Sequence, residues 1–575
     1  MANLNIKAKK ENSYDAIVIG SGMSGGWAAK EFCEKGLKTL VLERGRMVRH
    51  VQDYPTMNKD PWDFEFRGAV TPEQYKRQEK QHRTGFLSEA DRHFFVDDID
   101  NPYTEEKRFD WIRGYHTGGR SLMWGKHCYR WSDLDFEANL KDGYGVDWPI
   151  RYQDIALWYD YVEKFVGISG EKLNLPQLPD GQFLPPMDLN CIEQHVRERI
   201  KAQFPGRTLT IGRVAHLTEP TEEHLKLGRG QCQYRNRCSR GCPYGAYFSS
   251  NSATLPAAER TGNMTLRPHS IAHSIIYDEQ LGRATGVRII DEETMEALEY
   301  YAPVIFSCAS ALGSTQILLN STSDRFPNGL GNDSGELGHN LMDHHYKVGA
   351  YGTYDGYQDQ YYKGRRPNGP YIPRYRNLDP EKENLPFLRG FGYQGDSGRE
   401  NWGRGANEAA VGKDFKDQLF KPGPWSISLV GFGECLPYHE NKVTLNHELK
   451  DKWGLPTLSF DCEFKENELK MREQMKADAK EMLEAAGIQN VETYDNIGAP
   501  GKGIHEMGTA RMGRDPKTSV LNKHNQLHAV PNVYVTDGAC MTSASCVNPS
   551  ITYMALTARA VDHAVSEMKK RNLKV

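Results

Sequence analysis

Residues 15–26 read Asp-Ala-Ile-Val-Ile-Gly-Ser-Gly-Met-Ser-Gly-Gly, and residues 27–35 continue them in a helical pattern. Four apolar residues lead into a glycine-rich turn, and a helix start follows at once. This pattern is typical of a buried parallel strand that delivers a pyrophosphate to the N-terminus of a helix. Because glycines alone also occur in ordinary turns, the interpretation depends on the flanking strand and helix.

The glycines of this stretch have separate expected roles. Gly20 would allow the tight turn, Gly22 the close approach of the backbone to a phosphate, and Gly25 the packing of helix on strand. The next apolar run, residues 39–43, ends in Glu43, at the distance from the turn where a ribose hydroxyl needs an acceptor. Together these features predict a dinucleotide-binding strand–helix–strand unit.

Composition narrows the class of protein. The chain has 575 residues, a charged fraction of 26% and a formal net charge of −4, which is typical of a globular protein of enzyme size. It contains no long basic run, so nucleic acid is not an expected partner. No apolar segment approaches the ~18 residues of a membrane span. Residues 1–10 have neither an apolar signal core nor a twin-arginine pair, so we expect no export signal in the chain itself.

Residues 114–125 form a second glycine-rich stretch, Gly-Tyr-His-Thr-Gly-Gly-Arg-Ser-Leu-Met-Trp-Gly. Gly118 and Gly119, followed by the small Ser121, suit a close approach of the backbone to a flat ring or a phosphate. A plain loop is the alternative interpretation.

Together the two stretches resemble the nucleotide-binding and flavin loops of the glucose-methanol-choline (GMC) oxidoreductases. The resemblance implies an α/β fold, with a Rossmann-like FAD-binding domain interleaved with a substrate domain built on an antiparallel β-sheet with helices. Some relatives attach FAD through a histidine of the flavin loop. Met123 stands there in this chain, so the resemblance implies non-covalently bound FAD. By its position in the family pattern, Ala272 would make a backbone contact to adenine.

The resemblance also sets expected domain boundaries. The FAD-binding domain would comprise residues 1–45, 114–135, 250–324 and 501–575, the substrate or cap domain residues 46–113, 136–205 and 325–500, and an iron–sulfur loop region residues 206–249.

Local patterns predict several further elements. Alternation in residues 425–430 and 442–445 predicts an antiparallel sheet in the substrate domain, and residues 466–486 predict a helix that covers one face of it. Residues 286–290 and 297–301 flank a polar turn, which predicts a hairpin in the FAD-binding domain.

The one cysteine cluster consists of Cys232, Cys238 and Cys242, with arginines between them. Three thiols could converge on one site, and the arginines would favour thiolates. Zinc would normally need a fourth ligand, which is not evident nearby, and a disulfide would use only two of the three. Three thiolates suit a 3Fe-4S cluster, and the same spacing recurs in catalytic subunits of bacterial FAD-dependent glucose dehydrogenases, which this chain resembles. Structural or redox-inactive cysteines stay as the alternative.

The C-terminal segment contains the elements H-x-x-G-T, which begins at His505, and N-P-x-x-T, which begins at Asn548. Both match the elements that carry the family's catalytic pair. An imidazole with a pKa near ~6.5 can accept a hydroxyl proton at neutral pH. An amide can donate a hydrogen bond as alkoxide character develops. A strand ending at Asp537 and Gly538, with a helix starting at Ser550, would place a helix N-terminus near the flavin.

The adjacent His344 and His345 invite a metal interpretation. However, neighbours in sequence rarely point at one ion, and the family uses this motif as a domain junction. We therefore expect both histidines to be structural.

The resemblance implies a FAD-dependent sugar dehydrogenase, with carbon 3 of glucosides as the best match for the oxidised position. Glucose 1-dehydrogenase, an oxygen-using sugar oxidase and a flavoprotein without alcohol chemistry stay open. Electrons would leave through the iron–sulfur cluster to a c-type cytochrome. Because such subunits are exported with a small signal-bearing partner, a periplasmic location is implied, with the cytoplasm as the alternative.

Overall fold

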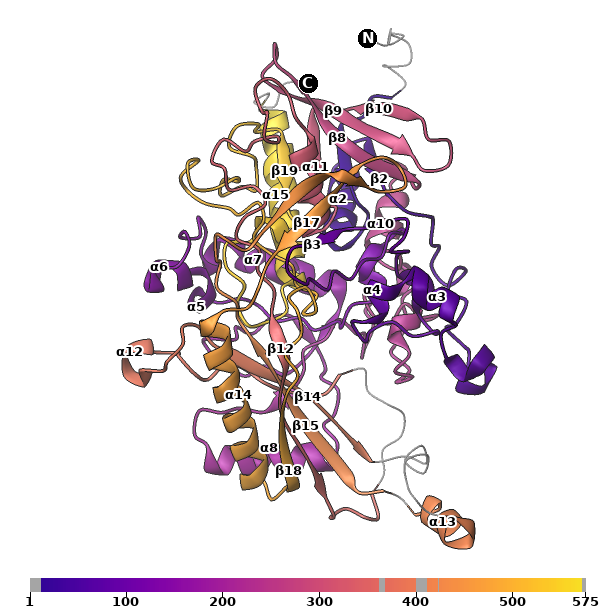
Figure 1. Ribbon diagram of the computed structural model, residues 1–575, viewed down its shortest axis with the longest axis vertical. Coiled ribbons are helices and arrows are strands. Elements are labelled where there is room, and N and C mark those ends of the chain that lie inside the picture. The colour runs from indigo at the N-terminus through magenta and orange to yellow at the C-terminus, as the bar shows by residue number, and fades with distance from the viewer. Residues whose placement is uncertain (1–11, 361–367, 400–410, 422, 571–575) are drawn as a thin grey trace.

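The computed structural model describes residues 12–360, 368–399, 411–421 and 423–570. The upper half of the molecule in Figure 1 is built on a five-stranded parallel sheet. Its order is β19 (Val533–Val535), β11 (Val304–Ser307), β1 (Ala16–Ile19), β2 (Thr39–Leu42) and β7 (Met264–Arg267). All residues of the four strands other than β7 are buried, as expected for a parallel sheet that is covered on both faces.

The order in which strands are added to this sheet reverses at β1. The strands β2 and β7 lie on one side of β1, and β11 and β19 lie on the other. In such sheets a ligand binds beyond the carboxyl ends of the strands at this point. The helix α2 (Met23–Glu34) follows β1 and packs against α10 (Thr254–Glu259) and α15 (Ser550–Lys569). The predicted dinucleotide-binding unit is therefore confirmed as a fold.

A three-stranded antiparallel sheet extends this half of the molecule. Its strands are β8 (Ser270–Asp278), β9 (Arg283–Asp291) and β10 (Ala297–Tyr301). The last two form the predicted hairpin, in which Gly286 pairs with Tyr301. β8 follows β7 closely and contacts β2, so its first residues lie at the edge of the parallel sheet.

The lower half is built on a six-stranded antiparallel sheet (Figure 1). Its order is β18 (Gln489–Asp495), β12 (His345–Tyr354), β15 (Trp425–Gly433), β14 (Phe391–Arg399), β13 (Pro370–Ile372) and β6 (Thr210–Ile211). Buried and partly exposed residues alternate along β15, which confirms the predicted period. The helices α14 (Glu466–Ala485) and α8 (Cys191–Gln203) pack on this sheet.

The alternating run at residues 442–445 belongs to another sheet. It lies in β16 (Lys442–Lys450), which pairs with β17 (Pro456–Asp461), and β17 pairs with β3 (Thr104–Glu105). The prediction that this run shares a sheet with residues 425–430 is therefore wrong. Alternation shows that one face of a strand is buried, but it does not show which partner buries it, and here both β16 and β17 contact α11 (Ala311–Asn320) of the nucleotide-binding half.

The remaining elements are short, except for the helix α7. They are α3 (Pro72–Arg77), α4 (Glu79–His82), α5 (Asp133–Phe136), α6 (Ala138–Asp142), α7 (Tyr152–Val166), α9 (Glu222–Lys226), α12 (Pro380–Glu383), α13 (Gly412–Leu419), β4 (Ile168–Ser169), β5 (Phe183–Leu184) and single 3-10 turns at Pro61–Asp63, Glu65–Gly68, Arg92–Phe94, Gly119–Leu122, Cys238–Arg240 and Gly538–Cys540.

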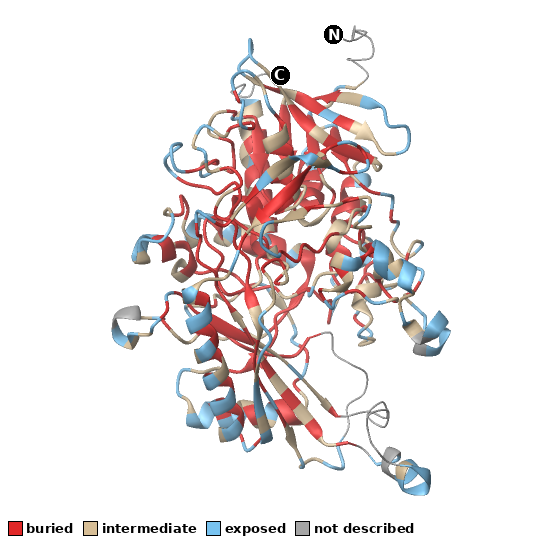
Figure 2. Ribbon diagram, in the orientation of Figure 1, coloured by how far each residue is buried: buried red, intermediate tan, exposed pale blue. Residues whose placement is uncertain are grey.

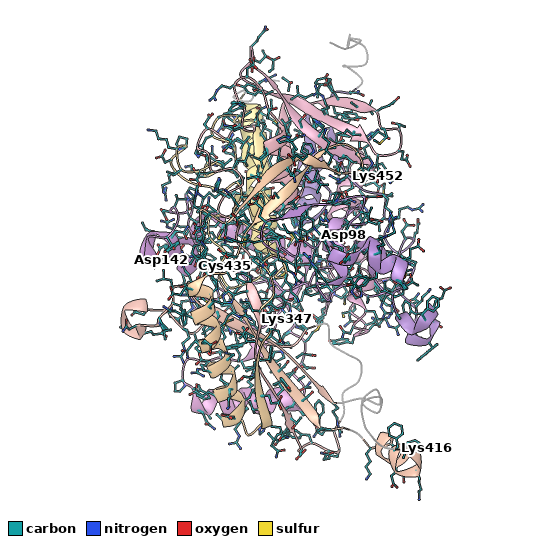
Figure 3. All side chains as sticks on the ribbon, in the orientation of Figure 1. Asp98, Asp142, Lys347, Lys416, Cys435 and Lys452 are labelled. Atoms are coloured by element: carbon teal, nitrogen blue, oxygen red, sulfur yellow. The ribbon has the colours of Figure 1, made fainter. Side chains whose placement is uncertain are left out.

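Buried residues concentrate in the strands and the inner helix faces of both halves (Figure 2). Side chains fill the space between the halves, where Lys347 of β12 is labelled near the middle of the long axis, whereas Lys416 of α13 lies at the lower end (Figure 3). Among the described residues, no helix is both long and apolar enough to cross a bilayer.

Candidate active site

A cavity of about 530 Å³ extends from the carboxyl ends of β1 and β2 to the start of α15, and residues of β14 and β15 also line it. It brings together most of the residues predicted from the sequence. Those that line it are Gly20, Gly22, Glu43, Gly119, Ser121, Ala272, His505, Asp537, Gly538, Asn548 and Ser550. Gly25, in the first turn of α2, and Gly118, in the second glycine-rich loop, do not line it.

The turn after β1 has the geometry of a phosphate cradle. Gly20 has a φ of +95°, and a Cβ there would lie 2.5 Å from the carbonyl oxygen of Cys308. A Cβ on Gly25 would lie 2.0 Å from the carbonyl oxygen of Gly20, so only glycine lets α2 pack this closely. At Gly22 an added Cβ would come no nearer than 3.8 Å to another atom, the carbonyl oxygen of Gly118. No side chain caps α2 in the described chain, which leaves its first N–H groups for an anion.

Glu43 lies directly after β2 at the other end of this cradle. The N–H and hydroxyl of Ser21 donate to Glu43 Oε2 at 3.2 and 2.5 Å, and the N–H of Gly45 donates to Oε1 at 3.0 Å. Burial raises the pKa of Glu43, and these donors oppose the rise. The carboxyl group is therefore held in one orientation, which fits a ribose hydroxyl as its partner.

The second glycine-rich loop is tied to the first. Gly118 has a φ of +85°, and a Cβ there would lie 1.6 Å from Asn251 Oδ1. Its N–H donates to the hydroxyl of Ser21 at 2.9 Å, and the hydroxyl of Ser121 donates to its carbonyl oxygen at 2.6 Å. Because the two turns share Ser21, the loop presents Gly119 and Ser121 to the cavity at a fixed position.

Asp537 and Gly538 follow β19 on the other side of β1. The hydroxyl of Ser314 donates to Asp537 Oδ2 at 2.5 Å, and the N–H of Ala539 donates to Oδ1 at 3.0 Å. Burial raises the pKa of Asp537 to about 6. A Cβ on Gly538 would lie 2.2 Å from the carbonyl oxygen of Glu506, so glycine allows the two C-terminal segments to meet here.

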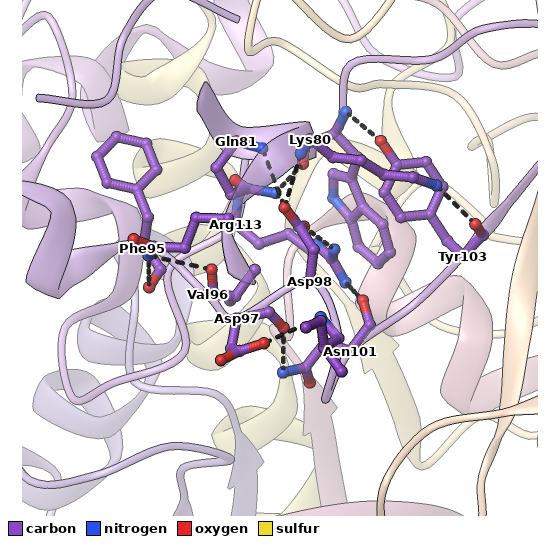
Figure 4. Close-up of polar contacts among 12 residues, drawn as sticks. Lys80, Gln81, Phe95, Val96, Asp97, Asp98, Asn101, Tyr103 and Arg113 are labelled. Carbon is purple, nitrogen blue, oxygen red and sulfur yellow. Dashed lines mark hydrogen bonds and ion pairs between the residues drawn. The ribbon is translucent and has the colours of Figure 1, made fainter. Parts of the chain in front are cut away.

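A wall of the cavity is formed by residues 79–113, a segment whose sequence shows little periodicity. Asp98 accepts hydrogen bonds from Gln81 Nε2 at 2.9 Å and from Arg113 Nη2 at 3.0 Å (Figure 4). Arg113, which lines the cavity, also donates to the carbonyl oxygen of Asn101 at 2.8 Å. Buried hydrogen bonds and an ion pair therefore link the short elements of this wall, α4, the turn at Arg92–Phe94 and β3.

The predicted catalytic pair meets at the end of the cavity opposite Glu43. Asn548 Nδ2 lies 3.4 Å from His505 Nε2, and Gln394 Nε2 of β14 donates to Asn548 Oδ1 at 2.7 Å. Ser550 begins α15 two residues later, so the N-terminus of a 20-residue helix points into this end of the cavity.

Residues 343 and 344, immediately before β12, hold His505 from two sides. Asp343 Oδ1 accepts the backbone N–H of His505 at 3.0 Å, and its Oδ2 accepts those of Gly501 and Gly503 at 2.8 Å each. His344 Nδ1 lies 2.9 Å from His505 Nδ1, with the two rings edge to face at 4.8 Å between centroids. The backbone and the ring of His505 thus have neighbouring supports.

Burial is the largest cause of the shifted pKa values of Asp343, His344 and His505. It lowers the pKa of His344 to about 4, and together with His344 and Arg120 it lowers the pKa of His505 well below its usual value. Burial and then the charge of Glu506 raise the pKa of Asp343 to about 7. Both imidazoles are therefore neutral at neutral pH.

His345 points away from this group. Its ring packs beside Phe464, with 5.9 Å between centroids, and a Cβ on Gly433 would lie 2.2 Å from its ring atoms. The two adjacent histidines therefore do not face one ion. His344 nevertheless contacts His505, and its interpretation as a domain junction missed that contact.

The three clustered cysteines lie close to the cavity but do not line it. Cys238 Sγ lies 3.5 Å from His216 Nε2, and Ser239 reaches the cavity wall. Burial, and then the nearby thiols Cys238 and Cys242, raise the pKa of Cys232 to about 11. Lys126 opposes the burial-driven rise in the pKa of Cys238. In the described chain, no three His, Cys, Asp or Glu side chains are placed to hold a metal ion, so the predicted metal site is not shown.

Comparison with known proteins decides the family. Residues 14–346 match the N-terminal family model of the GMC oxidoreductases, and residues 437–557 match the C-terminal one. The chain is a GMC oxidoreductase. It is therefore a FAD-dependent oxidoreductase that acts on the CH–OH group of alcohols or sugars, and the cavity, with its glycine cradle and buried Glu43, has the features that FAD requires.

Similar proteins span nearly the whole of this GMC oxidoreductase. A 2-methyl-1,2-propanediol dehydrogenase of Mycolicibacterium austroafricanum is 29% identical, over 96% of this chain and 94% of the relative. The fructose dehydrogenase large subunit of Gluconobacter japonicus is 23% identical, over 97% and 99%. The gluconate 2-dehydrogenase flavoprotein of Pantoea cypripedii is 24% identical, over 96% of this chain and 93% of the relative. Among solved structures, pyridoxine 4-oxidase from Mesorbium loti has the same fold, with a TM-score of 0.57 at 14% identity over 96% and 99% of the two chains.

Sequence reasoning missed one more feature of this GMC oxidoreductase. Arg120 donates to both carboxylate oxygens of Glu506, at 2.9 and 2.7 Å, and both residues line the cavity beside His505. The only available signal was position, since Arg120 lies in the flavin loop and Glu506 follows the predicted base. The bidentate ion pair holds the Arg120 guanidinium in a fixed position near the reacting end.

Proposed function

We propose that this GMC oxidoreductase is a sugar dehydrogenase that oxidises a secondary ring hydroxyl, with carbon 3 of a glucoside as the best match. The observation that carries the proposal is that His505 and Asn548 meet in a cavity whose far end is the nucleotide cradle. The names of the fructose and gluconate dehydrogenase relatives support a sugar. The choice of carbon 3 rests on the resemblance of the sequence alone.

His505 and Asn548 supply the acid–base part of this reaction. His505 Nε2 takes the hydroxyl proton, and Asn548 Nδ2 donates a hydrogen bond to the oxygen as its negative charge develops. FAD, when bound, supplies the hydride acceptor. Met123 stands at the flavin-loop position where some relatives have a histidine that binds FAD covalently. We therefore propose that FAD is held non-covalently.

We propose that Cys232, Cys238 and Cys242 hold a 3Fe-4S cluster rather than a single ion. In such a cluster each thiolate binds its own iron, so the sulfur atoms stand further apart than around one metal. The thiols of Cys232, Cys238 and Cys242 lie within electrostatic range of one another, and Lys126 lies beside them. The cluster, when bound, would pass electrons singly to an external carrier. We propose a c-type cytochrome as that carrier, a small signal-bearing subunit as partner, and the periplasm as location.

An anaerobic spectrum, with iron and acid-labile sulfide assays, tests the proposal. Glucose and a methyl glucoside are added separately, and bleaching of the flavin by either one, with about three irons per chain, supports a cluster-containing dehydrogenase. The better reductant distinguishes carbon 1 from carbon 3. Flavin that bleaches in a chain prepared without oxygen and free of iron rejects the cluster, and peroxide release that matches sugar consumption identifies an oxidase.

The role of His505 is tested by His505→Ala. We expect the rate of flavin reduction to fall about 10²- to 10⁴-fold, the range for loss of a general base, while FAD is retained. His447→Gln, at an exposed position on β16, is the control and should reduce flavin at the parent rate. Unchanged reduction in His505→Ala would exclude His505 as the base.

A further inference from the structure

The bonds around His505 form one chain of four contacts between groups from four separate segments. Gln394 Nε2 donates to Asn548 Oδ1 at 2.7 Å, and Asn548 Nδ2 lies 3.4 Å from His505 Nε2. His505 Nδ1 lies 2.9 Å from His344 Nδ1, and His344 Nε2 lies 3.2 Å from the carbonyl oxygen of Ala544. Each imidazole nitrogen can donate or accept a hydrogen bond. The groups at the two ends of this series of contacts therefore determine the direction of each hydrogen bond.

The carbonyl of Ala544 fixes the direction, because it can only accept. His344 Nε2 must therefore carry a proton, and in the neutral ring Nδ1 is then the acceptor. The proton shared by the two rings accordingly belongs to His505 Nδ1. His505 Nε2 is left with a lone pair on the side of Asn548 and the cavity. The opposite direction would place two lone pairs against each other at His344 and Ala544.

The carbonyl of Ala544 is itself held in place by its neighbours. The hydroxyl of Ser545 donates to Asp135 Oδ1 at 2.6 Å, and Trp148 Nε1 donates to the hydroxyl of Ser543 at 2.8 Å. Ser545 also has a φ of +57°, a conformation that a residue with a side chain keeps only when its surroundings require it. Ala544, which sets the direction of these hydrogen bonds, is therefore part of a rigid, buried segment.

We propose that His344 is a positioning residue that selects the tautomer of His505, holding the proton on Nδ1 so that Nε2 faces the substrate as the base. This inference rests on the proposed role of His505. Asp343 holds the backbone of His505 and His344 its ring, so two consecutive residues fix both the place and the protonation of the base. After the hydroxyl proton arrives on Nε2, the same Nδ1–H still has its acceptor, and no group must move.

The test compares His344→Asn with His344→Leu, two side chains of nearly the same shape. Asn offers a carbonyl oxygen where His344 Nδ1 stood, whereas Leu offers no acceptor. We expect anaerobic flavin reduction to slow about 10- to 100-fold in His344→Leu, because a buried N–H loses its partner and the wrong tautomer is favoured. We expect His344→Asn to lose about threefold or less, with KM, FAD content and Tm alike in both.

Equal slowing in both variants, at equal Tm and FAD content, would reduce the role of His344 to packing and overturn the inference. Parent rates in His344→Leu would overturn it as well. His505→Ala separates this inference from the proposed function. A slow His505→Ala beside a fast His344→Leu rejects only the tautomer role, whereas a fast His505→Ala rejects the function of the base itself.

If His344→Leu does not retain FAD, His344→Asp addresses the same contact. A carboxylate that accepts from His505 Nδ1 stabilises the imidazolium, so the acid limb of flavin reduction should move to higher pH by about one unit. An unmoved limb would overturn the inference. The titratable groups that face His505 in the parent are His344, Asp343, Arg120, His127 and Glu506, and only the first is changed.

Discussion

The two ends of the cavity are built in different ways. At the nucleotide end, contiguous sequence and backbone do most of the work, since Gly20, Gly25 and Glu43 lie within one strand–helix–strand unit. At the reacting end, side chains from distant segments meet, as with His344, Gln394 and Asn548 around His505. The first end depends on the absence of side-chain atoms, and the second on the direction of hydrogen bonds.

The largest effect should come from filling the backbone cradle. Gly25→Val places side-chain atoms where even a Cβ would lie 2.0 Å from the carbonyl oxygen of Gly20, so we expect protein without bound FAD. Gly22→Ala is the contrast, because its Cβ would come no nearer than 3.8 Å to another atom of the protein, and it should fold with weaker FAD binding. Flavin content and Tm measure both. Full flavin in Gly25→Val would show that the nucleotide end tolerates side chains after all.

A smaller effect should follow from removing one donor at the reacting end. Gln394→Met keeps the length of the side chain but leaves Asn548 Oδ1 without its partner, so the amide can turn its oxygen toward His505. We expect kcat/KM to fall about tenfold, as for the loss of one buried hydrogen bond, with flavin content unchanged.

The matched control is Gln474→Met on α14, away from the cavity lining. Gln474 Nε2 also donates to a side-chain oxygen, Asp478 Oδ1 at 2.8 Å, so this variant loses a comparable hydrogen bond outside the reacting end. It should keep the parent kcat/KM. If Gln394→Met had the same kcat/KM as Gln474→Met, Gln394 would have no role in orienting Asn548.

The smallest effect concerns pH. Burial, and then His344, Arg120 and His127, lower the pKa of His505, so the base is already unprotonated at pH 6.5. Because activity of a base is lost only as pH falls through its own pKa, titration of His505 should change flavin reduction less than about twofold from pH 6.5 to 8. An acid limb near pH 7 would instead belong to Asp343, whose pKa is about 7. Anaerobic stopped-flow measurements across this range test it. An acid limb centred at or above pH 6.5 that persists in Asp343→Asn would contradict the buried, neutral state of His505.

The same difference explains what the sequence could predict. The glycine turn, the hairpin at residues 286–301 and the helix on the antiparallel sheet follow from local patterns, because each is determined by neighbours in the chain. Family motifs pointed to His505 and Asn548, which the fold brings to 3.4 Å. No local pattern shows that Gln394 reaches Asn548 across 154 positions of sequence, or that Arg120 pairs with Glu506. The first contact exists only after the two halves have packed, and the second only after segments 386 positions apart have met.

The order of the strands in the chain also has a consequence for biosynthesis. β2 ends at Leu42 and β19 at Val535, yet both belong to one sheet, and residues after both strands line the cavity. At about 5–20 residues per second, a ribosome needs roughly 25–100 s to make the chain between them. β7 and β11 are made partway through this time, whereas β19, the neighbour of β11, is made only at its end. A complete cavity can therefore meet its flavin only after Asn548 and Ser550, which line it, have been made.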